Sequence, residues 1–302
     1  MDIGKNTGRG SGFKDFMNSS SLIARVSFIL LIIIIFIAIL QLSITFFAWW
    51  FDPSKNPHLL DGMIQANNGM VIPQDPKMQK STTIVRSVNG PNGIEFTWSV
   101  WLFIDGTAIG SDDSTVYKHV FNKGNINFGN DGISLVNNAP GMYIYPNKNA
   151  LYIIMNTYNA VKETVTVNDI PLNKWVNVIM RCRNTNLDVY VNGVITKSLK
   201  LSSVPKQNYG DVNVALNGGF NGYISNLWYY SYALGTAAIY DLVRAGPNTT
   251  MASGANVMNK ESKYLSTRWF FSGAGDQFNP VGSGYQLNRN NEMQGGRYYF
   301  NG

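Results

Sequence analysis

A continuous apolar run from Val26 to Ala48 constrains this 302-residue chain more than any other feature. The run contains no charged residue. As a helix that rises ~1.5 Å per residue, it would be roughly 34 Å long, which is enough to cross a hydrocarbon core of about 30 Å. We therefore expect a transmembrane helix over residues 22–50, and the rest of the chain would be attached to a bilayer by this one segment.

The residues at the two ends of the run favour a retained anchor over a cleaved signal peptide or a buried core helix. Signal peptides have a shorter apolar region followed by small residues at the cleavage site, whereas this run leads directly into Trp49 and Trp50. Tryptophan prefers the bilayer interface, and an arginine at the other end can extend its guanidinium toward the headgroups. We predict that Arg25, Trp49 and Trp50 lie at the membrane interface.

The charges around the run predict its orientation. Lysine and arginine exceed aspartate before the run but not after it, and cytoplasmic flanks carry the excess of basic residues. The N-terminus is therefore predicted on the cytosolic or inner side, and the larger C-terminal part on the other side. Residues 1–21 are rich in glycine, serine and asparagine, and they are predicted to be a disordered tail.

Beyond the run, the chain has the composition of an all-β domain. Only 14% of its residues are charged, while glycine and aromatic residues are frequent, which suits short strands joined by turns. Prolines interrupt every period between residues 51 and 90, so this segment is predicted to be a proline-rich stalk with one short strand near residues 82–88. A dense pattern of alternating segments extends from about residue 91 to residue 247.

Two local patterns predict specific strands within that segment. Every second residue from Phe96 to Ile104 is apolar, so one face of this strand should be buried. Asn192-Gly193 separates two alternating segments, which favours a two-residue hairpin turn because both residues tolerate positive φ. Trp98 and Trp175 are the side chains that we expect to fill the centre of the core.

Three motifs, in this order, resemble the laminin G-like domains of the concanavalin A-like superfamily. They are Phe96-Thr97-Trp98-Ser99-Val100-Trp101, then Trp175-Val176 with residues 187–193, then residues 220–227 with Ala233-Leu234 and Ile239-Tyr240. The resemblance implies a mainly β fold, an antiparallel jelly-roll sandwich over residues 91–247, in addition to the N-terminal transmembrane helix. Residues 248–302 then form an aromatic, glycine-rich C-terminal extension that packs on the sandwich or on a neighbouring subunit.

The sequence argues against most enzyme classes. Relatives of this sandwich that hydrolyse polysaccharides use closely spaced carboxylates, and no glutamate here has a second carboxylate two or four residues away. The chain has two histidines and one cysteine, Cys182, which alternates onto an apolar strand face and is predicted to be buried. A net charge of +6 without a long basic run gives no support for nucleic-acid binding. We expect no enzymatic activity, with a polysaccharide hydrolase as a distant alternative.

Calcium is the one cofactor that we consider. The resemblance implies a calcium site at the rim of the sandwich, where Asp112, Asp113 and Asp131 could supply hard oxygen ligands. Aspartates in loops also satisfy their own backbone at turns. Both interpretations stay open at this point.

A candidate binding face is predicted on adjacent strands of the second motif. Arg181, Arg183, Tyr190 and Lys197 could together bind acidic glycans or anionic lipid headgroups. The alternative is an ordinary solvated face of the sheet.

The leading hypothesis is a non-enzymatic, membrane-anchored structural or adhesion protein. An anchor followed by a laminin G-like domain resembles proteins of large DNA viruses, which implies a minor capsid or virion component that ties a membrane to a protein shell. Its partners would be the bilayer and other structural proteins, of the capsid or the membrane, and it would lie in a virion membrane beneath or within a capsid, or otherwise on a cell surface or endomembrane. The alternative is a surface receptor module that binds glycans.

Overall fold

The computed structural model describes residues 21–50, 53–78, 81–87, 89–90, 93–110 and 114–252, together with two short strands at 286–287 and 293–294. The predicted tail, except for residue 21, and most of the predicted C-terminal extension therefore lie outside the described residues. The chain divides into two units, Met1–Asp52 and Pro53–Gly302.

The first unit contains one long helix, α2 (Leu22–Trp50), over the predicted residues. The helix is apolar on all sides and buries none of its side chains, as expected of a helix whose surroundings are lipid. Two of its hydroxyls are satisfied within the helix: those of Ser43 and Thr45 donate to the carbonyls of Ile39 and Gln41, at 2.8 and 2.9 Å. By length and composition, α2 is suited to cross a membrane as a span or signal anchor.

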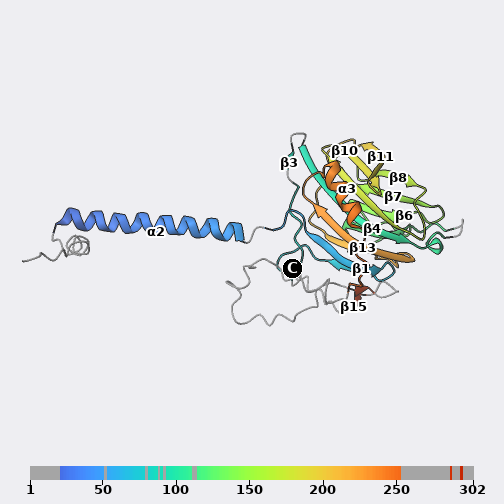
Figure 1. Cartoon of the computed structure of the whole chain (residues 1–302), viewed down its shortest axis with the longest axis horizontal. Coiled ribbons are helices and arrows are strands. Elements are labelled where there is room, and N and C mark those ends of the chain that lie inside the picture. The colour runs from blue at the N-terminus through green and yellow to red at the C-terminus, as the bar shows by residue number, and fades with distance from the viewer. Residues whose placement is uncertain are drawn as a thin grey trace, which may run out of the picture. The chain divides into compact units, whose positions relative to one another are not determined.

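The second unit is a sandwich of two antiparallel sheets, which confirms the predicted fold class (Figure 1). Sheet A has the order β1-β13-β4-β9-β10-β11, and β3 (Asn89–Gly90) pairs with β4. These six strands are His58–Gln65, Gly222–Tyr230, Gly93–Ile104, Trp175–Arg183, Asn186–Val191 and Val194–Lys200. Sheet B has the order β15-β14-β2-β12-β5-β6-β7-β8. Its strands are Met293–Gln294, Gln286–Leu287, Met70–Ile72, Asp211–Val214, Lys118–Gly124, Asn138–Ile144, Ala150–Met155 and Glu163–Asn168.

The core lies between the sheets, and β4 supplies its central row. Every second residue from Phe96 to Ile104 is buried there, as the alternation predicts. The Trp98 ring lies 5.5 Å from the Phe121 ring of sheet B and 5.0 Å from the Tyr229 ring of β13. Trp98 therefore joins the two layers at their centre.

The prediction that Trp175 also fills the core is wrong. Val176, its neighbour on β9, is fully buried between the sheets, so the alternation of the strand directs Trp175 to the outer face of sheet A. There it makes an edge contact with Phe103 of β4, with ring centroids 5.7 Å apart.

The predicted hairpin is present, and a helix follows sheet A. Asn192 and Gly193 have φ of 49° and 81° between β10 and β11, as a two-residue turn requires. Helix α3 (Thr236–Ala245) ends at Gly246, whose φ is 75°. Ile239 of α3 packs with Ile179 on the outer face of sheet A, so this helix covers part of that face (Figure 1).

The segment predicted to be a stalk contributes three strands instead. β1 pairs with β13, β2 pairs with β12, and the short β3 pairs with β4. The register of β1 shifts twice, and Gly62 within it has a φ of 91°. These irregularities break the two-residue period by which strands are recognised in sequence. The strand predicted near residues 82–88 is absent from the described residues 81–87, which run without strand pairing.

Replacement of the two tryptophans should separate their roles. We expect Trp98→Ala to lower the free energy of unfolding by about 3–5 kcal/mol, because it opens a cavity where both sheets meet. Trp175→Ala should cost about 1 kcal/mol, because the outward ring is only partly buried. Chemical denaturation of the full chain in detergent micelles, followed by near-ultraviolet circular dichroism, measures both. Equal losses would contradict this assignment of the core.

Candidate functional site

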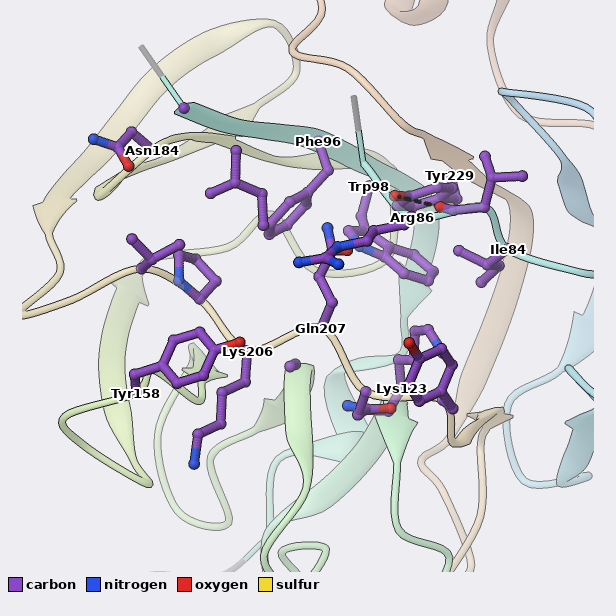
Figure 2. Close-up of a pocket in the computed structure, with 18 residues that line it drawn as sticks. Ile84, Arg86, Phe96, Trp98, Lys123, Tyr158, Asn184, Lys206, Gln207 and Tyr229 are labelled. Carbon is purple, nitrogen blue, oxygen red and sulfur yellow. Dashed lines mark hydrogen bonds between the residues drawn. The ribbon is translucent and has the colours of Figure 1, made fainter. Parts of the chain in front are cut away.

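A cleft of about 490 Å³ opens between the two sheets, and we take it as the candidate site (Figure 2). Strands β4 and β13 of sheet A line one side, and β5 and β6 of sheet B contribute to the other. Residues 84–86 and the loop of residues 204–209 complete it. Its volume lies within the range of about 300–1,000 Å³ that small-molecule sites occupy.

The floor of the cleft is aromatic. Phe96 and Trp98 of β4 lie beside Tyr229 of β13, because Trp98 and Tyr229 are directly paired in sheet A. Burial raises the pKa of the Tyr229 hydroxyl above its usual range, so this group stays a hydrogen-bond donor. It donates to the Val85 carbonyl at 3.1 Å. The floor therefore also holds the chain segment that crosses the cleft.

That segment, residues 81–87, is here called the strap. It has no strand pairing, and side chains of the sandwich hold it instead. The amide of Ile84 donates to Oε1 of Gln74 at 2.9 Å, and Nε2 of Gln207 donates to the Ser87 hydroxyl at 2.5 Å. This support brings Arg86 to the cleft, and Figure 2 shows its side chain reaching across the opening beside Gln207.

Three cationic side chains line the cleft: Arg86 on the strap, Lys123 on β5 and Lys206 in the loop of residues 204–209. None of the lining residues that the structure describes is acidic. Arg86 and Lys206 are exposed, and the ammonium of Lys206 lies 5.8 Å from the centre of the Tyr158 ring. The electrostatic potential of the cleft is therefore positive.

Lys123 is the buried member of this set. Its residue is only 8% exposed, and its ammonium donates to the Gly210 carbonyl at 2.7 Å. Burial lowers the pKa of Lys123 to about 8, although the nearby Asp211 carboxylate acts in the opposite direction. A lysine in this setting has lost most of the water that would ordinarily stabilise its charge.

Two tyrosines among the lining residues are strongly exposed. Tyr158 is 65% exposed and Tyr209 is 93% exposed. Such rings present an apolar face and a hydroxyl to solvent, a combination that is enriched at binding surfaces. The amide oxygen of Gln207, by contrast, is buried and accepts no hydrogen bond from the described residues. The cleft thus combines stacking surfaces with an unused acceptor.

The predicted binding face on sheet A is not formed, because α3 covers it. Arg181 and Tyr190 are 8% and 7% exposed. The Arg181 guanidinium donates to the Asp188 carboxylate at 2.9 Å and to the Leu234 carbonyl at 3.2 Å, and it lies 4.9 Å from the Tyr190 ring. Arg181 alternates with the buried Cys182, which places it on the outer face, but alternation contains no information about the helix that packs there.

Arg183 and Lys197 are exposed, but they lie on opposite sides of sheet A. Arg183 follows Cys182, whose side chain points into the core, and so it faces outward. Lys197 is paired with Val189, a core residue, and therefore lies on the inner side of the edge strand β11. The register of the sheet thus separates residues that the sequence suggested as neighbours.

Of the predicted calcium ligands, the structure describes only Asp131, and Asp112 and Asp113 lie outside the described residues. Oδ1 of Asp131 accepts the amide of Ile133 at 3.0 Å, and Gly132 has a φ of 79°. This is the geometry of a turn closed by its own aspartate. Within the described part of the chain, no group of three or more histidine, cysteine or acidic residues is placed to hold a metal.

The other residues singled out from the sequence are the cysteine and the three residues expected at the membrane interface. Cys182 is fully buried in the core, as predicted, and burial raises the pKa of its thiol to about 12, which keeps it unreactive. Arg25 lies in the first turn of α2, and Trp49 and Trp50 lie in its last turn. All three are exposed.

Sequence reasoning missed the cations of the cleft. Arg86 lay in the segment assigned to a stalk, and Lys123 and Lys206 each looked like an isolated polar residue next to a turn. The exposed Tyr158 and Tyr209 close to lysines were the one available signal. Such a signal is weak, because tyrosines on strands also pack inward.

The two arginines of β9 provide a test of this geometry. We expect Arg181→Ala to lower the free energy of unfolding by roughly 3–5 kcal/mol, because Asp188 would remain buried without its partner. Arg183→Ala, at the exposed end of the same strand, should change it by less than about 0.5 kcal/mol. Urea denaturation of both variants compares them directly. A large loss for Arg183→Ala would show that the outer face is arranged differently.

Two solved structures of toxin binding domains are similar to part of this chain. The receptor binding domain of botulinum neurotoxin C/D mosaic serotype is 15% identical with a TM-score of 0.38, and the match covers 50% of this chain and 36% of that one. The binding domain of botulinum neurotoxin serotype D is 14% identical with a TM-score of 0.39, and the match covers 50% and 37%. The chain thus spans little more than a third of the length of these structures. No curated protein matches it.

The family model of the concanavalin A-like lectin/glucanases superfamily matches residues 80–240, which is more than half of the chain. The matched segment includes β4, the cleft and the first half of α3. The chain therefore belongs to the concanavalin A-like lectin/glucanase superfamily.

Proposed function

We propose that the protein is a membrane-attached, non-enzymatic binding module whose sandwich holds a glycan in the cleft between its sheets. The observation that carries this proposal is the composition of the cleft. It combines an aromatic floor, two exposed tyrosines and the unused amide oxygen of Gln207 in about 490 Å³.

The hydrogen-bonding groups of the cleft favour a glycan. A buried amide oxygen without a partner is costly, and a hydroxyl of a bound ligand would satisfy it. The side chain of Asn184 adds a further donor and acceptor at the lining. Sugar rings offer many hydroxyls together with apolar faces for Tyr158 and Tyr209.

The distribution of carboxylates favours binding over hydrolysis. Glycoside hydrolysis uses two carboxyl groups on either side of the scissile bond, roughly 5–10 Å apart. The described lining of the cleft offers neither. Glu163 lies elsewhere, and its carboxylate accepts hydrogen bonds from the hydroxyls of Thr157 and Ser202, at 2.7 and 2.6 Å. This carboxylate is occupied by a loop contact, which supports a non-catalytic module.

The apolar helix supports a membrane location for the module. A helix as long and apolar as α2 would keep the sandwich attached to a bilayer. The charge bias around the helix supports an orientation with the N-terminus on the cytosolic or inner side. The sandwich would then meet its ligand on the opposite side of that membrane.

A second candidate is the structural tether, a virion component that ties a membrane to a protein shell. The observation that favours it is the open edge of sheet A. Val194 and Ile195 of β11 are 67% and 52% exposed, and the edge strand can pair with a strand of another chain. These two exposed aliphatic side chains at the start of β11 offer an apolar contact to a protein partner.

Glycan binding can be tested on an array with the full chain in nanodiscs of neutral lipid. Tyr158 and Tyr240 are equally exposed, at 65%, but Tyr240 lies on α3, away from the cleft. We expect Tyr158→Ala to weaken glycan binding roughly 3- to 10-fold through loss of stacking, and Tyr240→Ala to leave it unchanged.

If the full chain binds no glycan on the array, with or without calcium, the proposed function is contradicted. Equal losses in the two tyrosine variants would show that the glycan binds elsewhere. A parallel measurement with a chelator tests the calcium hypothesis, because glycan binding that depends on calcium would then be lost.

The tether can be tested in purified particles. We expect a photo-crosslinking residue at Ile195 to form adducts with one shell protein, because β11 would add to a strand of that protein. The same residue at Tyr240 is the control. If the protein is absent from purified virions, or if both positions form the same adducts, a tether through this edge is ruled out.

A further inference from the structure

We propose that the glycan in the cleft is acidic, and that Arg86 and Lys123 bind its carboxylate or sulfate group. This inference rests on the proposed function and specifies its ligand. The distribution of charge in the cleft favours an acidic sugar over a neutral one.

The cations of the cleft are not neutralised by the protein that surrounds them. Both ion pairs between described residues lie elsewhere, at His58–Asp61 and Arg181–Asp188. Asp211 is the acidic group whose charge reaches Lys123, but it does not line the cleft, and its Oδ1 accepts the amide of Gln74 at 2.9 Å. An anionic ligand would therefore meet an excess of positive charge.

Lys123 supplies the inner contact. Burial of an ammonium without a carboxylate in direct contact is unfavourable, and a bound anion would offset part of this cost. One of its three N–H donors is directed to the Gly210 carbonyl at 2.7 Å. The others are available to an acidic oxygen that enters the cleft.

Arg86 supplies the outer contact. Figure 2 shows its guanidinium in the opening of the cleft, beside Gln207 and over the aromatic floor. The planar guanidinium donates two parallel hydrogen bonds to a carboxylate or sulfate, an arrangement that lysine cannot reproduce. The strap that carries Arg86 is held by hydrogen bonds from Tyr229 and Gln207, so the position of its backbone is set by the sandwich.

Stacking and hydrogen bonding would recognise the ring of one sugar unit, and the cations would recognise its acidic group. The ring would stack on Tyr158 or Tyr209, and one of its hydroxyls would donate to the amide oxygen of Gln207. The acidic group would then lie between Arg86 and Lys123. Discrimination against a neutral sugar follows, because a neutral sugar would leave both cations unpaired.

The test uses the full chain in nanodiscs of neutral lipid and an array that pairs each acidic glycan with a neutral counterpart. Oligogalacturonate is paired with its methyl ester, and a heparin-derived oligosaccharide with its desulfated, carboxyl-reduced form. These pairs also separate recognition of a carboxylate from recognition of a sulfate. Arg86→Gln is the test variant, and Arg183→Gln, an exposed arginine outside the cleft, is the matched control.

We expect the acidic member of at least one pair to bind 10-fold or more tightly than its counterpart. Arg86→Gln should abolish most of this difference, and Arg183→Gln should preserve it. Lys123→Met should act in the same direction, and circular dichroism shows whether this variant still folds. If it does not fold, Arg86→Gln decides alone.

Equal binding of acidic and neutral members, unaffected by Arg86→Gln, would overturn this inference and leave the cleft as a neutral glycan site. Equal losses in both arginine variants would also overturn it, because a diffuse charge effect would then explain the selectivity. Binding of no glycan of either kind would overturn the proposed function itself.

Discussion

The packing of β4 against sheet B is the interaction on which the rest of the structure depends. Trp98 contacts Phe121 across the core and Tyr229 on the neighbouring strand. The same row of side chains continues into the cleft, where Phe96 and Trp98 form the floor. The core and the candidate site are therefore parts of one surface, and the site is built on a strand whose inner face is fully packed. This arrangement suits a binding site, because little ordering of the protein remains to be done when a ligand arrives.

The outer face of sheet A has a different role. Helix α3 packs Ile239 onto it, and the ion pair between Arg181 and Asp188 lies beneath this cover. The charged side chains there stabilise one another instead of meeting a ligand. In the cleft the opposite holds, because Arg86, Lys123 and Lys206 have no acidic neighbour among the described lining residues. The contrast between paired and unpaired cations, more than the number of cations, distinguishes a structural surface from a candidate binding site.

Local patterns predicted the features that depend on neighbouring residues. The alternation of residues 96–104, the Asn192-Gly193 turn and the burial of Cys182 all agree with the structure. The predictions that failed involve contacts or irregularities that a local pattern does not contain. β1 was missed because bulges break its period, and Trp175 was placed in the core on account of its size, although its register directs it outward. The face of Arg181 was predicted correctly, but its burial depends on a helix more than 50 positions away.

By itself, the sequence determined the long apolar helix, the mainly β character and the alternating strands, because hydrophobic periodicity and turn chemistry are local properties. It also determined the scarcity of groups for acid-base or metal chemistry. Only the tertiary structure decided where the cleft lies and which side chains line it. Ser87 and Gln207, which are 120 positions apart, hold the strap that brings Arg86 beside the lining of both sheets. Contacts over such separations arise when two sheets pack face to face, and no local pattern records which residues will meet.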